Sequence, residues 1–219
     1  MTVSQVEWPR ELPMFPLGSV ALPGVGLPLH VFEPRYRALV LTCLMSDHLF
    51  GSVLIERGSE VGGGDSRSDV GTLLRIVSAE ESADGRWAIV GVGTERLRVL
   101  EWRDDDPFPR CLAEPWPDGP QTSETADRLQ QTQRATQTFL ERIAGAQSDS
   151  VAVNDLDPNP SIASFQLAAI LPLGPLDRLT ALRAPDPDSR LSYLLETLNE
   201  QTILLDALDA LDGGPDASN

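Results

Sequence analysis

The first hundred residues alternate short apolar runs with glycine and proline turns, a pattern typical of a protein built from strands. The predicted strands cover residues 14–17, 27–32, 49–55, 72–81 and 86–102. The turn Pro23-Gly24-Val25-Gly26 separates the first two, whose prolines favour edge or bulged strands. Asp84-Gly85 joins the last two and is a strong signal for a hairpin.

One helix is predicted within this strand region. Pro34 can begin a helix because its missing N–H is not needed in the first turn. The apolar residues Tyr36, Val40, Cys43 and Leu44 then follow at helical spacing and form one stripe. We therefore expect a helix that packs this stripe against the strands. Residues 62–69, which begin with three glycines, predict a flexible loop.

The second half of the chain has the periodicity of helices. The predicted helices cover about 123–144, 160–170, 175–182 and 187–212. Asn159 followed by Pro160 is a helix cap, and Gly213-Gly214 ends the last helix. The predicted inner faces are Leu129, Thr136, Leu140 and Ile143 in the first helix, and Leu191, Leu194, Leu195, Leu198, Leu205 and Leu208 in the last. The acidic segment 147–158 is expected to be a mobile loop.

A proline-rich segment from Asp104 to Pro120 separates the part with strand patterns from the part with helix patterns. Its prolines are incompatible with a helix interior or a central strand, so we predict an extended edge and linker there. The chain is therefore expected to be an α+β protein with two subdomains. Residues 1–118 would form a small, mostly antiparallel β-barrel with an inserted helix, and residues 119–219 an acidic helical bundle.

The charge is strongly negative, which narrows the possible functions. The 33 acidic residues exceed the 17 basic ones, all of them arginine, and give a net charge of −16. Such a charge disfavours nucleic-acid binding, which needs a basic patch. Because lysine is lacking, a Walker-type phosphate loop, a Ser-Lys dyad and a Schiff base are excluded. The acidic excess lies mainly in the helical half of the chain.

Cysteine use and the chain's start favour the cytoplasm. Cys43 and Cys111 are far apart in the sequence, and we expect two buried, reduced thiols. The first residues show no signal peptide, and the longest apolar stretch, 165–176, is too short to span a bilayer.

Motifs that could carry catalysis are incomplete. Gly64–Ser68 lacks the last glycine of a nucleophile elbow, and Gly91–Arg96 has arginine where a dinucleotide fingerprint needs its third glycine. His30 and His48 do not have the spacing of a metal site, and Asp104–Asp106 is better explained as a solvated linker. We expect no catalytic residues, no metal and no cofactor.

The densest mixture of aromatic and charged residues follows the second predicted strand. Phe32, Glu33, Arg35 and Tyr36 are candidates for a peptide-binding rim, because aromatic residues and arginine are the usual anchors of interfaces. The alternative is structural: Glu33 and Arg35 would pair at the junction of strand and helix, with Tyr36 in the core. We favour this alternative, and both interpretations remain open from the sequence alone.

The same segment resembles a known family. The runs that carry the resemblance are 11–17, 22–24, 27–37, 50–58, 70–72, 84–86, 93–99, 167–173 and 188–198. The run Phe32-Glu33-Pro34-Arg35-Tyr36 and the spaced G-T and G-x-x-R elements are specific when taken together. Together they resemble the amino-terminal, substrate-binding domain of Lon proteases, as a bacterial stand-alone form. The resemblance implies a PUA-like barrel followed by helices, and a domain that recognises substrates and does not cut them.

We therefore expect a non-catalytic protein- or peptide-binding module, as an adaptor or regulator in proteolysis or quality control. Its partners would be unfolded or tagged polypeptides, or a protease or chaperone. An RNA-binding PUA-like protein is the alternative. A cluster of Arg75, Arg86, Arg96 and Arg98 would favour it, although the net charge opposes it. A small-molecule enzyme is a third hypothesis, which a deep pocket lined by carboxylates would favour.

Overall fold

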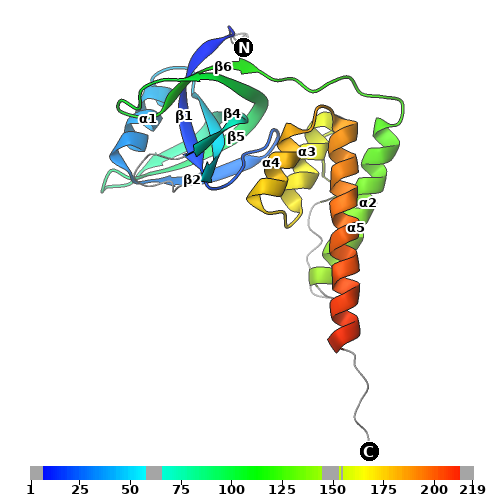
Figure 1. The fold of residues 1–219 in the computed structure, drawn as a ribbon. Coiled ribbons are helices and arrows are strands. Elements are labelled where there is room, and N and C mark those ends of the chain that lie inside the picture. Colours follow the sequence, from blue (N-terminus) through cyan, green and yellow to red (C-terminus); the bar gives the residue numbers. More distant parts are fainter. Residues whose placement is uncertain (1–6, 58–65, 145–152, 154, 213–219) are drawn as a thin grey trace, which may run out of the picture. The chain divides into compact units, whose positions relative to one another are not determined.

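The computed structural model describes residues 7–57, 66–144, 153 and 155–212. Its strands are β1 (Arg10–Leu17), β2 (Gly26–Val31), β3 (Leu49–Arg57), β4 (Ser66–Glu81), β5 (Trp87–Trp102) and β6 (Arg110–Pro115) (Figure 1). Its helices are α1 (Pro34–Leu44), α2 (Thr125–Ala144), α3 (Pro160–Ile170), α4 (Pro175–Arg183) and α5 (Pro187–Asp212). The chain divides into two compact units, 1–118 with 172–183, and 119–171 with 184–219.

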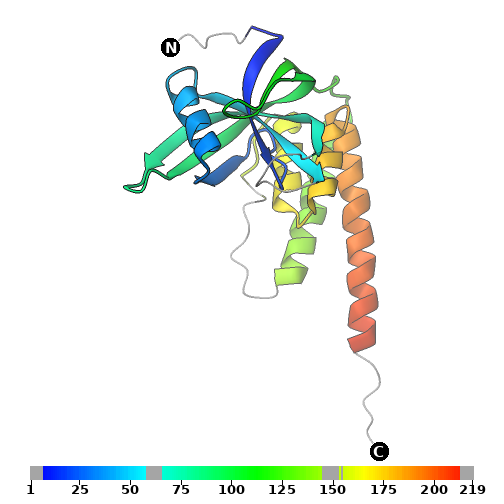
Figure 2. The same cartoon turned by 60° about the vertical axis from the view of Figure 1, so that its left-hand side comes forward.

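The six strands form one mixed sheet that closes on itself. The strand order is β2-β5-β4-β3-β1-β6, and β6 also pairs with β5. Strands β1 and β3 are parallel, with Met14 opposite Gly51, and the other pairs are antiparallel. Five strands therefore make a closed ring, and β2 lies outside it, against β5 (Figure 2).

The proline-rich segment contains the strand that closes the ring. We predicted an extended edge and linker from Asp104 to Pro120. Strand β6 is extended as predicted, but it pairs on both sides and is therefore not an edge strand. Its prolines do not interrupt the pairing, because Pro109 precedes the strand and Pro115 is its last residue. Between them, Cys111 is paired with β1 on one side and with β5 on the other.

The predicted loop of residues 62–69 is also corrected in part. Strand β4 begins at Ser66, and Arg67 and Ser66 pair with the end of β3, so residues 66–69 are strand. The remainder, 62–65, lies outside the described residues. The same holds for most of the acidic segment 147–158, so its predicted mobility stays a prediction.

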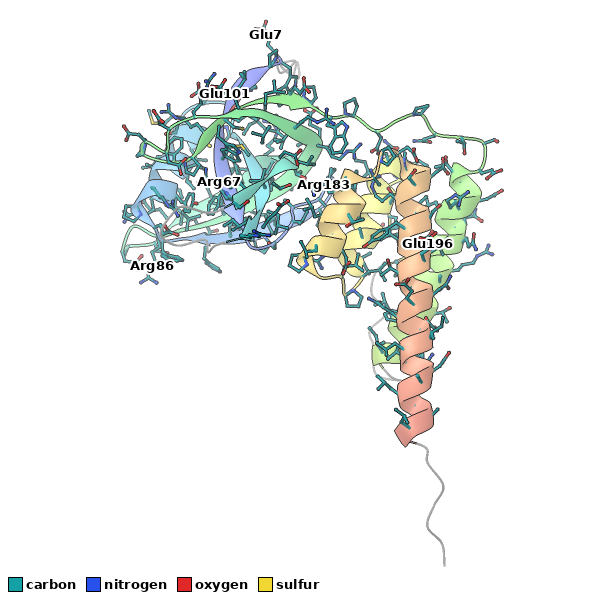
Figure 3. All side chains as sticks on the ribbon, viewed as in Figure 1. Glu7, Arg67, Arg86, Glu101, Arg183 and Glu196 are labelled. Carbon is teal, nitrogen blue, oxygen red and sulfur yellow. The ribbon has the colours of Figure 1, made fainter. Side chains whose placement is uncertain are left out.

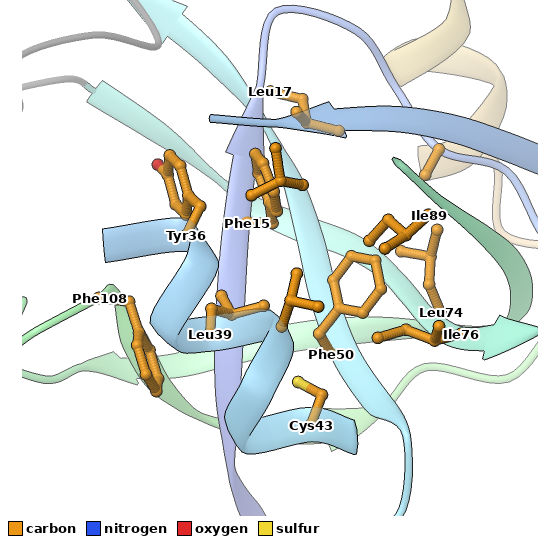
Figure 4. Close-up of a cluster of buried hydrophobic side chains, with 13 residues drawn as sticks. Phe15, Leu17, Tyr36, Leu39, Cys43, Phe50, Leu74, Ile76, Ile89 and Phe108 are labelled. Carbon is orange, nitrogen blue, oxygen red and sulfur yellow. The ribbon is translucent and has the colours of Figure 1, made fainter. Parts of the chain in front are cut away.

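Helix α1 packs on the ring as its apolar stripe predicts. It begins at Pro34 after an extended Glu33, and Tyr36, Val40 and Cys43 are buried. Leu39 is buried as well, whereas Leu44, which was assigned to the stripe, is only half-buried. These side chains meet residues of β1, β3, β4 and β5 in one hydrophobic cluster (Figure 4).

Helix α4 groups with the strands, although the sequence placed it in the helical half. The guanidinium of Arg96 on β5 donates to the Leu182 carbonyl at 2.7 Å. At the end of α4, Arg183 pairs with Asp69 at 2.8 Å and with Glu56 at 3.2 Å. These charged contacts attach the helix to the sheet. The subdomain division at residue 118 stays a prediction.

In the second unit, α2 packs against α3 and α5, and α3 also packs against α5. The predicted cap is confirmed, because the Asn159 side chain accepts from the Ser161 N–H at 3.1 Å. Two predicted inward positions are wrong: Ile143 and Leu208 are 46% and 48% exposed. Each lies near the end of its helix. In the described ranges, no helix has the length and hydropathy to cross a membrane.

Candidate functional site

The predicted rim residues lie where β2 ends and α1 begins. The backbone of Glu33 is extended, and Pro34 starts the helix immediately after it. The chain therefore turns sharply within two residues of Phe32. This turn sends Phe32 and Tyr36 into different environments, although they lie only four positions apart.

Tyr36 is part of the core. Its side chain is buried, and its ring stacks on Phe15 of β1 with centroids 4.1 Å apart (Figure 4). The structural interpretation therefore holds for the position of Tyr36, which is too buried to form an exposed rim. It still lines a surface groove from below.

Glu33 and Arg35 are half-buried and bound to each other. The Arg35 Nε donates to Glu33 Oε2 at 3.0 Å, and the guanidinium carbon lies 4.5 Å from the centroid of the Tyr36 ring. Both the ion pair and the ring contact hold Arg35 over the core. These two residues position the junction and bring one positive and one negative group beside Phe32.

Phe32 is the exposed member of the set. Phe32 is 58% exposed, a large fraction for an aromatic residue. It lies between two cavities that share Phe32, Val31 and His30. An exposed aromatic side chain beside two hollows is a suitable anchor for another chain.

The first cavity, which we call the β2 groove, has a volume of about 280 Å³. Its apolar lining includes Phe15, Leu17, Leu27, Leu29, Phe32 and Tyr36. The side chains come from β1, β2 and the first turn of α1. The groove is therefore built by packing between segments that are separated in the sequence.

The second cavity, which we call the hairpin cavity, has a volume of about 360 Å³ and extends to the β4–β5 turn. Ser82, Asp84, Arg86 and Trp87 line it opposite Phe32. In Figure 3, Arg86 projects outward at this end of the strands. We did not predict these residues as part of the site from the sequence. The register that places Trp87 opposite Val31 joins residues far apart in the chain.

The turn that carries Asp84 has the predicted form. Gly85 has a φ of 76°, and the Ser82 N–H donates to the Arg86 carbonyl at 2.8 Å. A side chain at Gly85 would overlap the Arg37 guanidinium, so Arg37 of α1 lies directly against the turn. The hairpin and α1 thus hold each other in place on one side of the hairpin cavity.

The site offers groups for binding an apolar side chain and the adjoining main chain. The lining combines aromatic and aliphatic groups with a few polar ones, which is the usual composition of a binding site. Within residues 7–57, 66–144, 153 and 155–212, no three histidine, cysteine or acidic side chains gather as metal ligands.

The arginine cluster suggested for RNA is only partly exposed. Arg75, Arg86 and Arg98 are exposed, whereas Arg96 is buried. Arg96 is 3% exposed and pairs with Asp118, while its guanidinium also lies over the Trp116 ring at 4.4 Å. Arg75 donates to the Asp47 carbonyl at 3.0 Å and Arg86 pairs with Asp84. A buried, neutralised arginine cannot displace counterions from a phosphate backbone. The RNA-binding alternative is not supported.

The fold and its sequence define the class of protein. Residues 11–200 match the family described as the ATP-dependent protease La (LON) substrate-binding domain. The chain therefore belongs to this family, whose named role is binding substrates and not catalysis. Membership in this family supports the interpretation of the chain as a protein-binding module.

Solved structures have the same fold. A crystal structure of a Lon N-terminal domain protein from Xanthomonas campestris superposes with a TM-score of 0.62 at 31% identity, covering 85% of this chain and 98% of that one. The N-terminal domain of a Mycobacterium avium complex Lon protease gives a TM-score of 0.66 at 18% identity, covering 87% of this chain and 98% of that one. The second likeness concerns the fold alone.

Curated relatives are longer proteins. A LON peptidase N-terminal domain and RING finger protein of Schizosaccharomyces pombe is 26% identical over 90% of this chain. Lon protease 2 of Myxococcus xanthus is 24% identical over 96% of it. The chain spans 48% of the first relative and 26% of the second.

Proposed function

We propose that this protein binds polypeptides through Phe32, with the β2 groove and the hairpin cavity on either side. The exposure of Phe32 carries the proposal. A 58% exposed phenylalanine gains from being covered by another chain, because its ring is apolar and large. Glu33 and Arg35 would contact the polypeptide with their polar groups, and Tyr36 supports the groove from the core.

The polypeptides that fit this surface are those with exposed apolar segments, which means unfolded or tagged chains. The family's description as a substrate-binding domain of a protease supports this choice. We therefore propose a role as an adaptor or regulator in proteolysis, with substrates of proteolysis or a protease itself as partners. We also propose that the ring of strands is PUA-like and that α2, α3 and α5 form a helical bundle.

A binding measurement with a permanently unfolded protein tests the proposal. Reduced, carboxymethylated α-lactalbumin is a suitable probe, because it is acidic like this chain and is not attracted by net charge. Fluorescence anisotropy of the labelled probe should show saturable binding. Phe32→Ala should raise the Kd about tenfold, because it removes an interface anchor of moderate strength.

The matched control is Leu100→Ala. Leu100 is 46% exposed and lies near the other end of β5, away from the Trp87 end that adjoins Phe32. This variant should bind as the wild type does. Equal losses in the two variants would mean that binding is unspecific, and no binding by the wild type would overturn the proposed function.

A further inference from the structure

The outer edge of β2 has no partner strand in the described part of the chain. Five strands close into a ring, whereas β2 stands at the end of the strand order and pairs with β5 alone. A strand edge carries N–H and C=O groups that another extended chain can bind. The β2 edge therefore differs from the strands whose two sides are occupied within the ring.

The register shows which backbone groups face outward. The Gly93 N–H donates to the Val25 carbonyl at 3.0 Å, so Val25 faces β5. Backbone direction alternates along a strand, and the β2–β5 register runs without interruption from Gly26 to Val31. The even-numbered residues Gly26, Pro28 and His30 therefore direct their backbone groups away from β5. They present three carbonyls but only two N–H groups, because proline has none.

The β2 groove lies along the same strand. Residues 27–32 all contribute to its lining, together with Phe15 and Leu17 of β1. Leu27 and Leu29 are half-buried, and Phe32 is exposed at the strand's end. A chain added at the β2 edge would place alternate side chains toward this apolar lining.

We propose that the β2 edge binds one extended segment of a non-native polypeptide as an additional strand, with apolar residues at alternate positions in the β2 groove. The inference rests on the proposed function and specifies how the polypeptide is bound. The main-chain hydrogen bonds are independent of sequence, and the groove selects for apolar side chains. A module of this kind binds many unfolded chains and few folded ones, whose strands are already paired.

Pro28 favours a foreign chain over a second copy as the occupant. Two copies paired through β2 would each bring a proline to the new ladder, so two N–H donors would be missing. A foreign strand meets the missing donor once. The net charge of −16 on each copy adds repulsion between like chains. Proline on an edge strand is a known protection against self-association.

Proline substitution at His30 tests the backbone contact. The His30 side chain is exposed and its N–H faces outward, so His30→Pro removes an outward donor without removing a bond to β5. The variant should bind carboxymethylated α-lactalbumin with a Kd at least about fivefold weaker, the contribution of one hydrogen bond. His30→Ala is the matched control, because it also loses the imidazole but keeps the N–H, and the fivefold difference is measured against this variant.

Pro28→Ala gives the opposite change. It restores an outward N–H, so the probe should bind about fivefold more tightly. The variant should also self-associate in sedimentation experiments at concentrations where the wild type does not. Unchanged binding and unchanged sedimentation in this variant would contradict the role assigned to Pro28.

Hydrogen exchange of the wild type provides a test that needs no substitution. The amides of Gly26 and His30 should exchange rapidly in the free protein and become protected in the complex. If the probe binds but these amides stay unprotected, and His30→Pro binds like His30→Ala, strand addition is overturned while the proposed function stands. If the wild type does not bind the probe, both are overturned.

Discussion

The rings of Phe15 and Tyr36 lie nearly parallel, with centroids 4.1 Å apart and planes inclined by 9°. Phe15 belongs to β1 and Tyr36 to the first turn of α1, so this stack attaches the start of the helix to the ring of strands. Because α1 begins directly after Phe32 and Glu33, the stack also fixes where Phe32 emerges at the surface. The proposed binding site thus depends on a contact inside the core.

Removing the Tyr36 ring should destabilise the fold. Tyr36→Ala leaves a cavity beside Phe15 and should lower the free energy of unfolding by about 3 kcal/mol. Tyr36→Phe keeps the stacked ring and should cost less than half as much. Urea unfolding followed by circular dichroism measures both values. A loss below about 1 kcal/mol for the alanine variant would show that the stack is not an important contact.

The two neighbouring arginines on β5 should behave differently. Arg96 is buried, pairs with Asp118 and donates to the Leu182 carbonyl, so Arg96→Ala removes both contacts and should cost about 3 kcal/mol of unfolding free energy. Arg98 also lies over the Trp116 ring, at 4.9 Å, but it is exposed. Arg98→Ala should cost less than about 1 kcal/mol. Thermal and urea unfolding of the two variants compare them, and similar costs would contradict this difference in burial.

The buried thiols should make stability fall at high pH. Burial raises the pKa of Cys43 and of Cys111 from 9.0 to about 12, and the nearby carboxylates of Asp47 and Glu11 add to the rise. Between pH 9 and 12 the unfolded chain loses thiol protons that the folded protein keeps, so unfolding becomes more favourable as pH rises.

Between these pH values, each thiol should lower the free energy of unfolding by about 1.4 kcal/mol per pH unit. Below this range the thiols should change it very little. Urea unfolding at a series of pH values measures the slope. The double variant Cys43→Ala, Cys111→Ala is the comparison, and it should have a smaller alkaline slope than the wild type. In the native wild type, a thiol reagent at pH 8 should label neither cysteine, because both are buried. Rapid labelling would contradict the burial.

A side chain at Gly71 should disrupt the ring. Gly71 of β4 lies opposite Val53 of β3, and a Cβ atom there would overlap the Ser52 carbonyl oxygen. Gly71→Ala should therefore lower the free energy of unfolding by about 3 kcal/mol, at the upper end of the usual cost of overpacking. Gly26→Ala is the control, since nothing lies within 4 Å of the added atom. The control should be neutral or slightly stabilising in the same unfolding assay.

Short-range signals in the sequence located most elements. Prolines at the first position of α1, α3, α4 and α5 mark the helix starts, and Asp84-Gly85 marks the hairpin turn. These rules act within a few residues and need no knowledge of the rest of the chain. The same local pattern singled out the segment from Phe32 to Tyr36 and carried the resemblance to the Lon family.

Strand pairing and helix burial depend on residues that are distant in the chain, and local signals in the sequence did not predict them. The central position of β6 could not be predicted from its prolines, because its pairing with β1 and β5 depends on where those strands lie. Local periodicity also placed Ile143 and Leu208 inside, although both are exposed. Whether a helix position is buried depends on how far its neighbouring helices extend.

The sequence by itself determined the family, the helix starts, the hairpin and the short segment that holds the candidate site. Only the tertiary structure decided that Tyr36 is core, that Arg96 is paired and buried, and that Phe32 and the outer edge of β2 are exposed. The physical reason is that a residue's type sets what it gains from burial or pairing. Whether the residue is in fact buried or paired depends on neighbours that the folded chain brings from elsewhere in the sequence.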